Sequence, residues 1–395
     1  MRITKIKINH FKSLVDFEID LTKFNCIVGL NGSGKSTFLQ FMSFLSQLMR
    51  GKINGWLQQR KWVKEDIVPE LDTKKHRIVH FNVFFERENF NGYWEGSFHV
   101  DRLCCVYEKL VANNYIFEAT NSANEKKYTF EKRNDFTKPV KSERINFNYE
   151  GSIFSQLADK DVSDKIGDLI EFFRGICAFD LLSPYFLKQA SKSSSNTIGI
   201  WGENIAPFLH GMEDKVRASV IRKIKQVYPE FNSFDTLPNP DGSKSLNIRE
   251  QYHDGNIIYD IPARGINDGL LRILAMLGQL NMTDPFLLFD EIENGINQEL
   301  VEFLLKELVE ARQQIVVTTH SPLFLNYLDG EIAKDSVHYF YKTPEGFTRC
   351  KKFFSLPSTR EKLGTLGAGE AIADTNLYRL NEEIELLDRN TGKGD

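Results

Sequence analysis

The 395-residue sequence has few of the features that mark disulfide-rich, zinc-binding or membrane-spanning proteins. It holds five cysteines and no Cys-x-x-Cys pair, which argues against a disulfide framework or a structural zinc and favours a reducing compartment. No apolar run reaches the roughly 18 residues that cross a bilayer, and the N-terminus lacks the apolar core of a secretion signal. We therefore expect a cytoplasmic protein without a membrane domain.

Strong charge and internal repeats are missing too. The net charge of −4 provides no global reason to bind nucleic acid. Residues 126–144 form the most basic stretch, with seven Lys/Arg against three Asp/Glu (7 − 3 = +4). A solvated strand face is the favoured interpretation of this stretch, and contact with nucleic acid or a partner is the alternative. No sustained heptad appears, so we expect no long coiled-coil arm.

One glycine-rich loop carries a specific chemical signal. It lies between the buried run Phe24–Val28 and the helical run Thr37–Met49, and it matches G-x-x-x-x-G-K-[ST] at every fixed position. Glycines let backbone N–H groups turn toward phosphate, Lys35 reaches the β- and γ-phosphates, and Ser36 ligates Mg²⁺. The residues expected to hold the nucleotide are Gly29, Asn31, Gly32, Ser33, Gly34, Lys35, Ser36 and Thr37.

A second metal anchor is expected at the end of the apolar strand Phe286–Phe289. Asp290 would hold Mg²⁺ through water, and Glu291 would polarise the attacking water as general base. His320, in "IVVTTHSP", follows another buried strand. A structural role is common for such a histidine, but ligands of parallel sheets lie at this edge, so we expect its imidazole to bond the γ-phosphate or the water. Lys35, Glu291 and His320 are the predicted catalytic residues.

Two other polar patterns allow more than one interpretation. In "ARGINDGLLRILAML", Asn267 or Asp268 is a good N-cap for an apolar helix, and the same helix N-terminus is also an anion site. His76 and His80 have a spacing that matches a metal pair only on a helix. They lie in a strand-like run, so metal ligation is not expected.

The periodicity of the chain predicts an α/β protein. Period-two alternation over 76–147 indicates antiparallel strands, 161–231 is largely helical, and the last third alternates helix and strand as in a parallel sheet. Residues 189–197, "QASKSSSNT", are expected to form a loop. We divide the chain into an N-terminal lobe, a mainly helical insertion that ends in strands, a C-terminal lobe and a tail, with bounds 1–160, 161–261, 262–354 and 355–395.

Taken in order, "GLNGSGKST", "INDGLLR", "LLFDE", "ENGIN" and "TTHSP" resemble the ATP-binding-cassette (ABC) ATPase superfamily. Within its soluble branch, the chain looks like the OLD-like AAA ATPases of prokaryotic defence systems, relatives of the RecF and SMC ATPases. The specific parts lie in 1–50 and 262–325. The resemblance implies an ABC-type head with a mixed or parallel central sheet, an antiparallel β subdomain and an inserted helical subdomain.

The resemblance also implies that two heads sandwich ATP and Mg²⁺. Asn267, Asp268 and Gly269 match the signature motif that faces the phosphate loop of the other head, with Asn in place of the usual Ser. The loop 293–297 resembles the segment that touches the dimer mate. Lys12 and Ser13 match a basic turn that approaches the nucleotide in relatives, and Gln156 is a weak candidate for the Q-loop glutamine.

OLD nucleases carry a Toprim domain with a DxD pair, and residues 322–395 contain no DxD. We therefore expect that the chain is not itself a Toprim nuclease. The resemblance implies an ATPase that forms homo-oligomers and regulates a separate effector, a nuclease or a toxin, in antiphage defence. A RecF-like ATPase that binds DNA directly is the alternative, and a nucleotide-locked scaffold with slow turnover is a third hypothesis.

Overall fold

The structure is a computed structural model that describes residues 1–70, 76–122, 125–132, 141–157, 164–192, 197–255 and 257–391. The chain forms two compact units. The first comprises Met1–Cys177, Glu331–Lys362 and Thr375–Asp395, and the second comprises Ala178–Gly330 and Leu363–Asp374. The chain first passes between them within strand β10 (Ile176–Phe179). No helix in the described ranges is long and apolar enough to cross a membrane.

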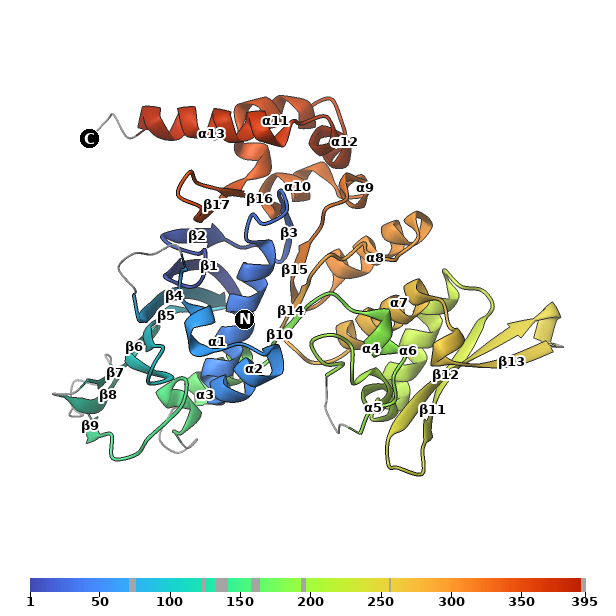
Figure 1. Cartoon of the computed structure of the whole chain (residues 1–395), viewed down its shortest axis with the longest axis horizontal. Helices are drawn as coiled ribbons and strands as arrows, with labels where there is room; N and C mark the ends of the chain where they lie inside the picture. Colours follow the sequence, from blue (N-terminus) through green and yellow to red (C-terminus); the bar gives the residue numbers. More distant parts are fainter. Residues whose placement is uncertain are drawn as a thin grey trace. The chain divides into compact units, whose positions relative to one another are not determined.

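An eight-stranded antiparallel sheet is the largest element of the first unit (Figure 1). Its strand order is β2-β1-β4-β5-β6-β7-β8-β9, so most neighbours in space are also neighbours in sequence. The strands are β1 (Arg2–Asn9), β2 (Phe17–Asp20), β4 (Ile78–Arg87), β5 (Phe90–His99), β6 (Cys104–Ala112), β7 (Tyr115–Asn121), β8 (Lys126–Lys132) and β9 (Lys141–Arg144).

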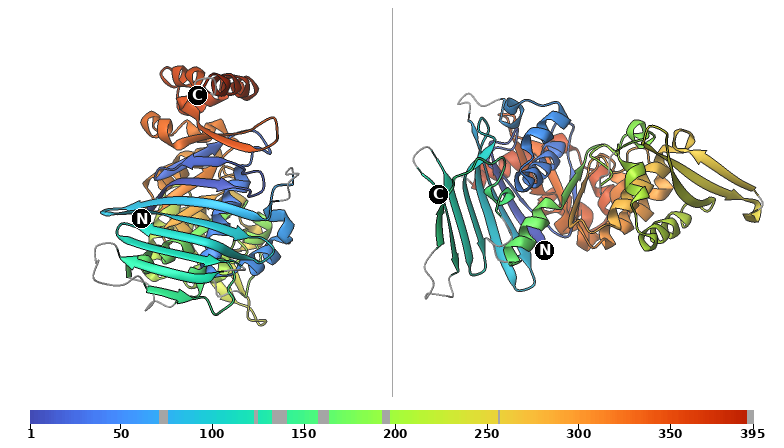
Figure 2. Two further views of the ribbon diagram at one scale, coloured as in Figure 1. Left: turned by 90° about the vertical axis from the view of Figure 1, so that its left-hand side faces the viewer. Right: turned by 90° about the horizontal axis from the view of Figure 1, so that it is seen from below.

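Helices α1 (Lys35–Arg50) and α3 (Asp164–Arg174) cover one face of this sheet (Figure 2). Aromatic side chains make the contact: the ring of Phe44 on α1 lies 5.0 Å from that of Phe98, and Phe173 on α3 lies 5.0 Å from Trp94. All four rings are fully buried. Removing each ring from water stabilises the folded state by roughly 1.5–3 kcal/mol. This packing anchors the helix that begins at the phosphate loop.

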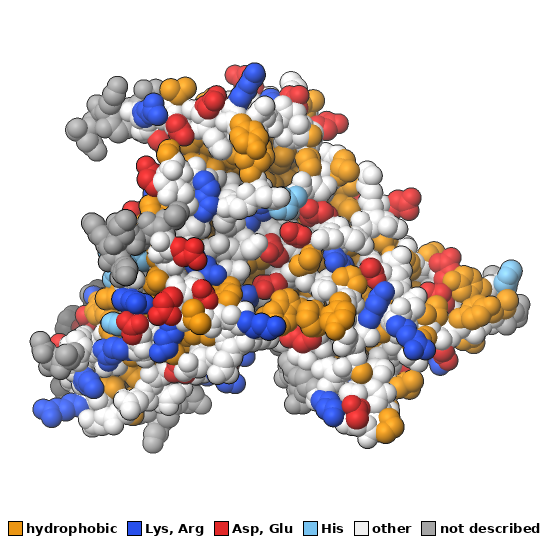
Figure 3. Space-filling model, viewed as in Figure 1, with side chains coloured by type: hydrophobic (Ala, Val, Ile, Leu, Met, Phe, Trp, Pro, Cys, Tyr) orange, Lys and Arg blue, Asp and Glu red, His pale blue; other side chains and the backbone are white. Residues whose placement is uncertain are grey.

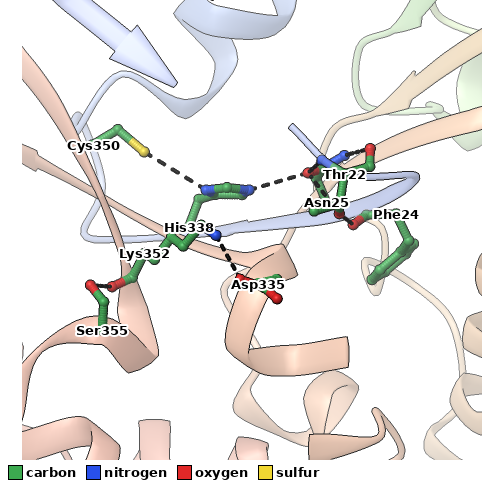
Figure 4. A network of polar contacts seen from close by, with 8 residues as sticks. All are labelled: Thr22, Phe24, Asn25, Asp335, His338, Cys350, Lys352 and Ser355. Atoms are coloured by element: carbon green, nitrogen blue, oxygen red, sulfur yellow. Dashed lines mark hydrogen bonds and ion pairs between the residues drawn. The ribbon is translucent and has the colours of Figure 1, made fainter. Parts of the chain in front are cut away.

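Three further strands of the first unit pair with one another. Strand β16 (Val337–Lys342) runs parallel to β3 (Phe24–Val28) and antiparallel to β17 (Thr348–Lys352). On β16, the His338 imidazole contacts the Asn25 Oδ1 atom at 3.2 Å and the Cys350 sulfur at 4.0 Å (Figure 4). Complete burial lowers the pKa of His338 to about 3, so the imidazole is neutral. This network ties the strand before the phosphate loop to the β16–β17 hairpin.

Shorter elements complete the first unit. Helix α13 (Leu377–Thr391) packs on β16, where the Tyr339 hydroxyl donates to Asn381 Oδ1 at 2.7 Å and lies 3.2 Å from the Leu377 carbonyl oxygen. The remaining elements are α2 (Ile53–Arg60), η1 (Lys64–Ile67), η2 (Ile153–Ser155), α10 (Gly330–Ser336), η6 (Phe353–Ser355) and α11 (Pro357–Leu363).

In the second unit, parallel strands β14 and β15 are accompanied by α7 and α8 (Figure 1). All residues of both strands are buried, as expected for parallel strands covered on both faces. The elements of this part are α4 (Pro184–Leu187), α5 (Ile205–His210), α6 (Asp214–Lys225), α7 (Asp268–Leu280), β14 (Phe286–Phe289), α8 (Gln298–Glu310), β15 (Gln314–Thr318), α9 (Pro322–Leu325) and α12 (Ala368–Ala373).

The second unit also carries a three-stranded antiparallel sheet of β11 (Phe231–Pro238), β12 (Lys244–Tyr252) and β13 (Ile257–Pro262). The short helices η4 (His253–Gly255) and η5 (Ala263–Gly265) flank β13. Apolar side chains gather at the outer end of this sheet (Figure 3). They belong to Tyr252, Ile257, Ile258 and Tyr259, which are 38–56% exposed.

The α/β class predicted from the sequence is confirmed. The structure differs from the predicted pattern in several places: β10 lies inside the run expected to be largely helical, β11 begins at its end, and α2 forms although Gly55 lies inside it. Helix α2 survives its glycine because Trp56 and Leu57 are buried, and tertiary packing outweighs propensity. Positions 193–196 of the predicted serine-rich loop lie outside the described residues. The division into four segments stays a prediction.

Candidate functional site

The predicted phosphate loop lies between β3 and α1 in the first unit. Gly32 and Gly34 have φ angles of 75° and 105°, which favour glycine. A Cβ atom on Gly34 would also lie 2.2 Å from the Thr348 hydroxyl oxygen. Glycine is therefore required at position 34 for two independent reasons. This backbone conformation is the one that turns successive N–H groups toward an anion.

Lys35 is the charged centre of this loop. Its side chain is 5% exposed, and its ammonium group donates to the carbonyl oxygens of Gly29 at 2.8 Å and Leu30 at 3.1 Å. The N-cap of α1 is Gly34, and no side chain caps the helix. Its first N–H groups are thus available to a phosphate, and the helix dipole favours negative charge there. These features fit a nucleotide phosphate.

The other predicted loop residues differ in exposure. Asn31 and Ser36 are exposed, Thr37 is half-buried and Ser33 is buried. The Ser33 hydroxyl has no hydrogen-bond partner among the described residues. The exposed Ser36 hydroxyl leaves its oxygen open to a hard cation such as Mg²⁺.

Thr348 on β17 braces the loop, and sequence reasoning missed it. Its hydroxyl donates to the Ser33 carbonyl at 2.9 Å and, because its hydrogen is then used, accepts from the Ser13 hydroxyl at 2.8 Å. The Thr348 N–H donates to the Ser13 carbonyl at 2.8 Å, and Lys342 donates to the Thr348 hydroxyl at 3.2 Å. The structure thus brings the predicted Lys12–Ser13 turn to the loop. No motif includes Thr348 because the contact spans 315 residues of sequence.

Asp290 and Glu291 lie directly after β14 in the second unit. The Thr318 hydroxyl donates to Asp290 Oδ1 at 2.5 Å and accepts from the Glu291 N–H at 2.9 Å. The Asp290 N–H donates to the Phe179 carbonyl at 3.1 Å, which places the end of β10 beside it. Glu291 has a φ of 47°, a sparsely populated conformation that costs about 1–3 kcal/mol. Thr318 therefore fixes the carboxylate of one acid and the strained backbone of the other.

His320 and the 293–297 loop lie at the same end of the parallel strands as Glu291. The His320 N–H donates to Glu293 Oε1 at 2.8 Å, and the His320 side chain is exposed. The Asn294 amide donates to Glu291 Oε2 at 3.1 Å. The structure thus brings Glu291, His320 and the 293–297 loop together, as expected from their positions after neighbouring strands.

The predicted signature residues begin helix α7. Asn267 Oδ1 accepts from the N–H groups of Gly269 at 2.8 Å and Leu270 at 3.2 Å, so Asn267 is the N-cap. Asp268 forms an ion pair with Lys188 at 2.6 Å. A Cβ atom on Gly269 would lie 2.9 Å from the Gly295 carbonyl, which shows how tightly this end of α7 meets the 293–297 loop.

Arg272, a buried residue of α7, links this helix to the 293–297 loop. Its guanidinium is buried and donates to the Asn294 carbonyl. Burial lowers the pKa of Arg272, and the nearby charges of Asp268 and Glu291 partly offset that effect. The sequence signal was present in "INDGLLR", where one arginine interrupts an otherwise apolar helix face.

Other candidates lie elsewhere. Gln156 is exposed and follows η2, which packs on the C-terminal end of α1; the phosphate loop lies at the other end of this 16-residue helix, about 24 Å away. The Q-loop candidate is therefore wrong. His76 stacks on His10 at 3.9 Å, and no cluster of three or more metal-ligating side chains occurs in the described part of the chain.

The basic stretch 126–144 is only partly described. Positions 133–140 lie outside the described residues, and the Lys127 ammonium is paired with Glu125 at 2.7 Å. The alternative interpretation of this stretch as a nucleic-acid contact stays a prediction.

Two family models match the chain. Residues 1–173 match an "AAA ATPase domain" model, and residues 206–326 match a model described as "AAA domain, putative AbiEii toxin, Type IV TA system". No curated protein matches the sequence.

Among solved structures, the chain is similar to the SMC head domain bound to the C-terminal winged-helix domain of ScpA. The identity is 14%, the TM-score is 0.54, and the match covers 89% of this chain and 98% of that one. An SMC head domain from Thermotoga maritima matches at 13% identity and a TM-score of 0.47, with 89% and 98% covered. The chain is thus similar to AAA-type ATPase domain models over residues 1–173 and 206–326, and its fold is similar to that of the SMC head with a TM-score of 0.54.

Proposed function

We propose that the chain binds and hydrolyses ATP, that it assembles through ATP held between two copies, and that this assembly regulates a separate effector protein in antiphage defence. The phosphate loop carries the proposal: Lys35 is buried among loop carbonyls, beside backbone N–H groups at an uncapped helix end. The positive charge of Lys35, the backbone N–H groups and the dipole of α1 all favour an anion at this loop, which supports a phosphate site.

The hydrolytic step uses the acidic edge of the second unit. Glu291 acts as general base on the attacking water, and His320 orients that water or the γ-phosphate. Thr318 keeps the Asp290 carboxylate in place for metal binding. Ser36 and Asp290 are the residues that would hold Mg²⁺, which would supply positive charge against the phosphates.

The assembly step uses the start of helix α7. The side-chain oxygen of Asn267 caps helix α7. Its side-chain NH₂ group can therefore donate to the γ-phosphate of ATP bound to a second copy. Asp268 would repel that phosphate by itself, but Lys188 neutralises it. Because Arg272 joins this helix to the loop beside Glu291, engagement of a second copy is coupled to the catalytic base.

The effector and the defence role rest on resemblance. The five motifs together resemble the ABC ATPases, and within that superfamily the chain looks like the OLD-like ATPases. The second matching model is described as an AAA domain, putative AbiEii toxin. The SMC head with a TM-score of 0.54 is bound to a domain of another protein, which makes a separate partner a reasonable expectation for this fold.

Three variants test the catalytic part of this proposal. Lys35→Ala should abolish ATP binding, because the loop loses its cation. Glu291→Gln should keep binding but lower kcat about 10²–10⁴-fold, because an amide cannot accept the proton. Glu299→Gln on the exposed first turn of α8 is the matched control and should behave as the unaltered protein. Unchanged ATP turnover in both Lys35→Ala and Glu291→Gln would refute the assignment.

Assembly is tested separately in the slow Glu291→Gln background. Mass measurement in solution should show larger species with ATP than without it. Adding Asp268→Arg should remove these species, because a bulky cation replaces the acid paired with Lys188, and it should leave ATP affinity of the single chain unchanged. Equal mass with and without ATP in the Glu291→Gln protein would contradict ATP-driven assembly.

A further inference from the structure

A cavity of about 360 Å³ lies beside the first turn of α1, within the first unit. Its lining includes Thr37, which directly follows Ser36 of the phosphate loop, and the Lys12–Ser13 turn. Trp62 and Lys342 form further parts of its wall. A ligand whose phosphates lie at the N-terminus of α1 has the remainder of its structure within reach of this cavity. The volume is within the usual range for small-ligand sites.

The position of Trp62 is set by the end of α2. Lys61 adopts a left-handed conformation, with φ of 57°, and the Trp62 N–H donates to the Leu57 carbonyl at 2.9 Å. The ring of Trp56 meets that of Trp62 edge-on, at 5.2 Å and 84°. Trp62 is half-buried and lines the cavity. It is thus a held aromatic surface next to the phosphate loop.

Two ammonium groups accompany this ring. Lys12 places its nitrogen 3.3 Å from the centre of the Trp62 ring and donates to Gln40 at 3.2 Å. Lys342 is half-buried beside Thr348, and burial lowers the pKa of its ammonium group. Asp66 and Glu70 also line the cavity, and Asp66 accepts from the Val63 N–H at 2.7 Å. The cavity therefore combines an aromatic face with cations near the phosphate loop and carboxylates near Trp62.

We propose that this cavity binds the nucleoside part of ATP, with the base stacked on Trp62 and with Lys12 and Lys342 near the phosphate closest to the ribose. The inference rests on the proposed ATP binding at the phosphate loop. Every nucleobase has an aromatic face, and stacking on tryptophan suits it. The carboxylates of Asp66 and Glu70 can accept from ribose hydroxyls or from an exocyclic amine.

The Lys12 side chain should change its position when a nucleotide binds. Without nucleotide, its ammonium group lies over the ring face that the base would use. A phosphate oxygen is a stronger partner for an ammonium group than an aromatic face is, because the contact is charge-assisted. Nucleotide binding therefore moves Lys12 from the ring to the phosphate and opens the face of Trp62.

The test compares two probes on the full chain with Mg²⁺: ATP and inorganic tripolyphosphate, which lacks the nucleoside. Trp62→Ala should weaken ATP binding about 10- to 100-fold and leave tripolyphosphate binding unchanged. Trp62→Phe, which keeps an aromatic face, should remain within a few-fold of the unaltered protein. The neighbouring Val63→Ala changes an exposed side chain and is the matched control. In the unaltered protein, ribose 5-triphosphate should bind weaker than ATP by a similar factor.

Each outcome separates this inference from the proposed function. If Trp62→Ala binds ATP normally, or if it weakens both probes equally, Trp62 is not a base platform. Equal affinity of the unaltered protein for ATP and ribose 5-triphosphate would overturn the inference even if Trp62→Ala fails to fold. Lys35→Ala should lose both probes, and if it binds both as the unaltered protein does, the phosphate loop assignment itself fails.

Discussion

The phosphate loop would present mainly backbone N–H groups to a nucleotide, whereas the end of β14 carries two carboxylates, those of Asp290 and Glu291. The loop takes its shape from glycines with positive φ and from the close approach of Thr348 to Gly34. The acidic edge takes its shape from one buried hydroxyl, that of Thr318, which contacts Asp290 and Glu291 at once. Backbone sites and side-chain sites should therefore fail under different substitutions.

The phosphate loop and the acidic strand end should also affect different kinetic quantities, ATP affinity and kcat. A backbone nest holds an anion in any chemical state, so its loss should appear mainly as lost affinity. A positioned base acts only as the reaction proceeds, so its loss should appear mainly in kcat.

The largest effect is expected from Gly34→Ala. The added methyl group meets the Thr348 hydroxyl and the residue must keep a φ of 105°, which together cost a few kcal/mol. ATP affinity should fall about 100-fold in a titration. The matched control is Gly55→Ala, where no atom lies within 4 Å and the helix should gain about 0.5–1 kcal/mol. Similar ATP affinities for Gly34→Ala and Gly55→Ala would show that the loop backbone does not determine ATP binding.

Two threonines give the next effect, one on each side of the comparison. Thr318→Val leaves an Asp290 oxygen and the Glu291 N–H without their shared partner, and kcat should fall about 10–100-fold with little change in ATP affinity. Thr348→Val removes the brace of Ser33 and should instead weaken ATP binding about 5–10-fold at nearly unchanged kcat. Steady-state kinetics with both variants measures these effects. A loss of ATP affinity in Thr318→Val together with a loss of kcat in Thr348→Val would contradict the prediction.

The last prediction concerns stability rather than ATP turnover, at a buried acid outside the phosphate loop and the end of β14. Glu108 on β6 accepts hydrogen bonds from Trp94, Ser152 and the Ile153 N–H, and burial raises its pKa to about 7. The folded state therefore holds the proton more tightly than the unfolded state, whose pKa is near 4.5. Stability from this group is complete below pH 4.5 and is lost as the pH rises to about 7, by roughly 3 kcal/mol.

Glu108→Gln removes this titration and should flatten the dependence of unfolding free energy on pH between 5 and 8. The amide is a poorer partner for the three donors and lowers stability by a constant amount at every pH. The slope, measured by denaturant unfolding at several pH values, is thus the diagnostic. Parallel profiles for the two proteins would show that Glu108 stays ionised in the fold.

Several features could be predicted because they depend on short segments. The loop Gly29–Ser36, the acidic pair after Phe286–Phe289 and the cap at Asn267 all need only local spacing and a strand or helix next to them. The Q-loop candidate Gln156 was wrong because a glutamine carries no local signal; only the packing of η2 on the far end of α1 decides its place. Helix α2 was missed because its glycine is offset by burial of Trp56.

The sequence by itself determined the α/β class, the phosphate loop and the acidic strand end, since periodicity and motif spacing follow from backbone geometry. Only the tertiary structure decided that Thr348 braces the loop, that Thr318 holds both acids, that Arg272 joins two segments and that Trp62 faces the cavity beside Thr37. These contacts join residues up to 315 positions apart. Their energy depends on distance in space, which no local pattern encodes.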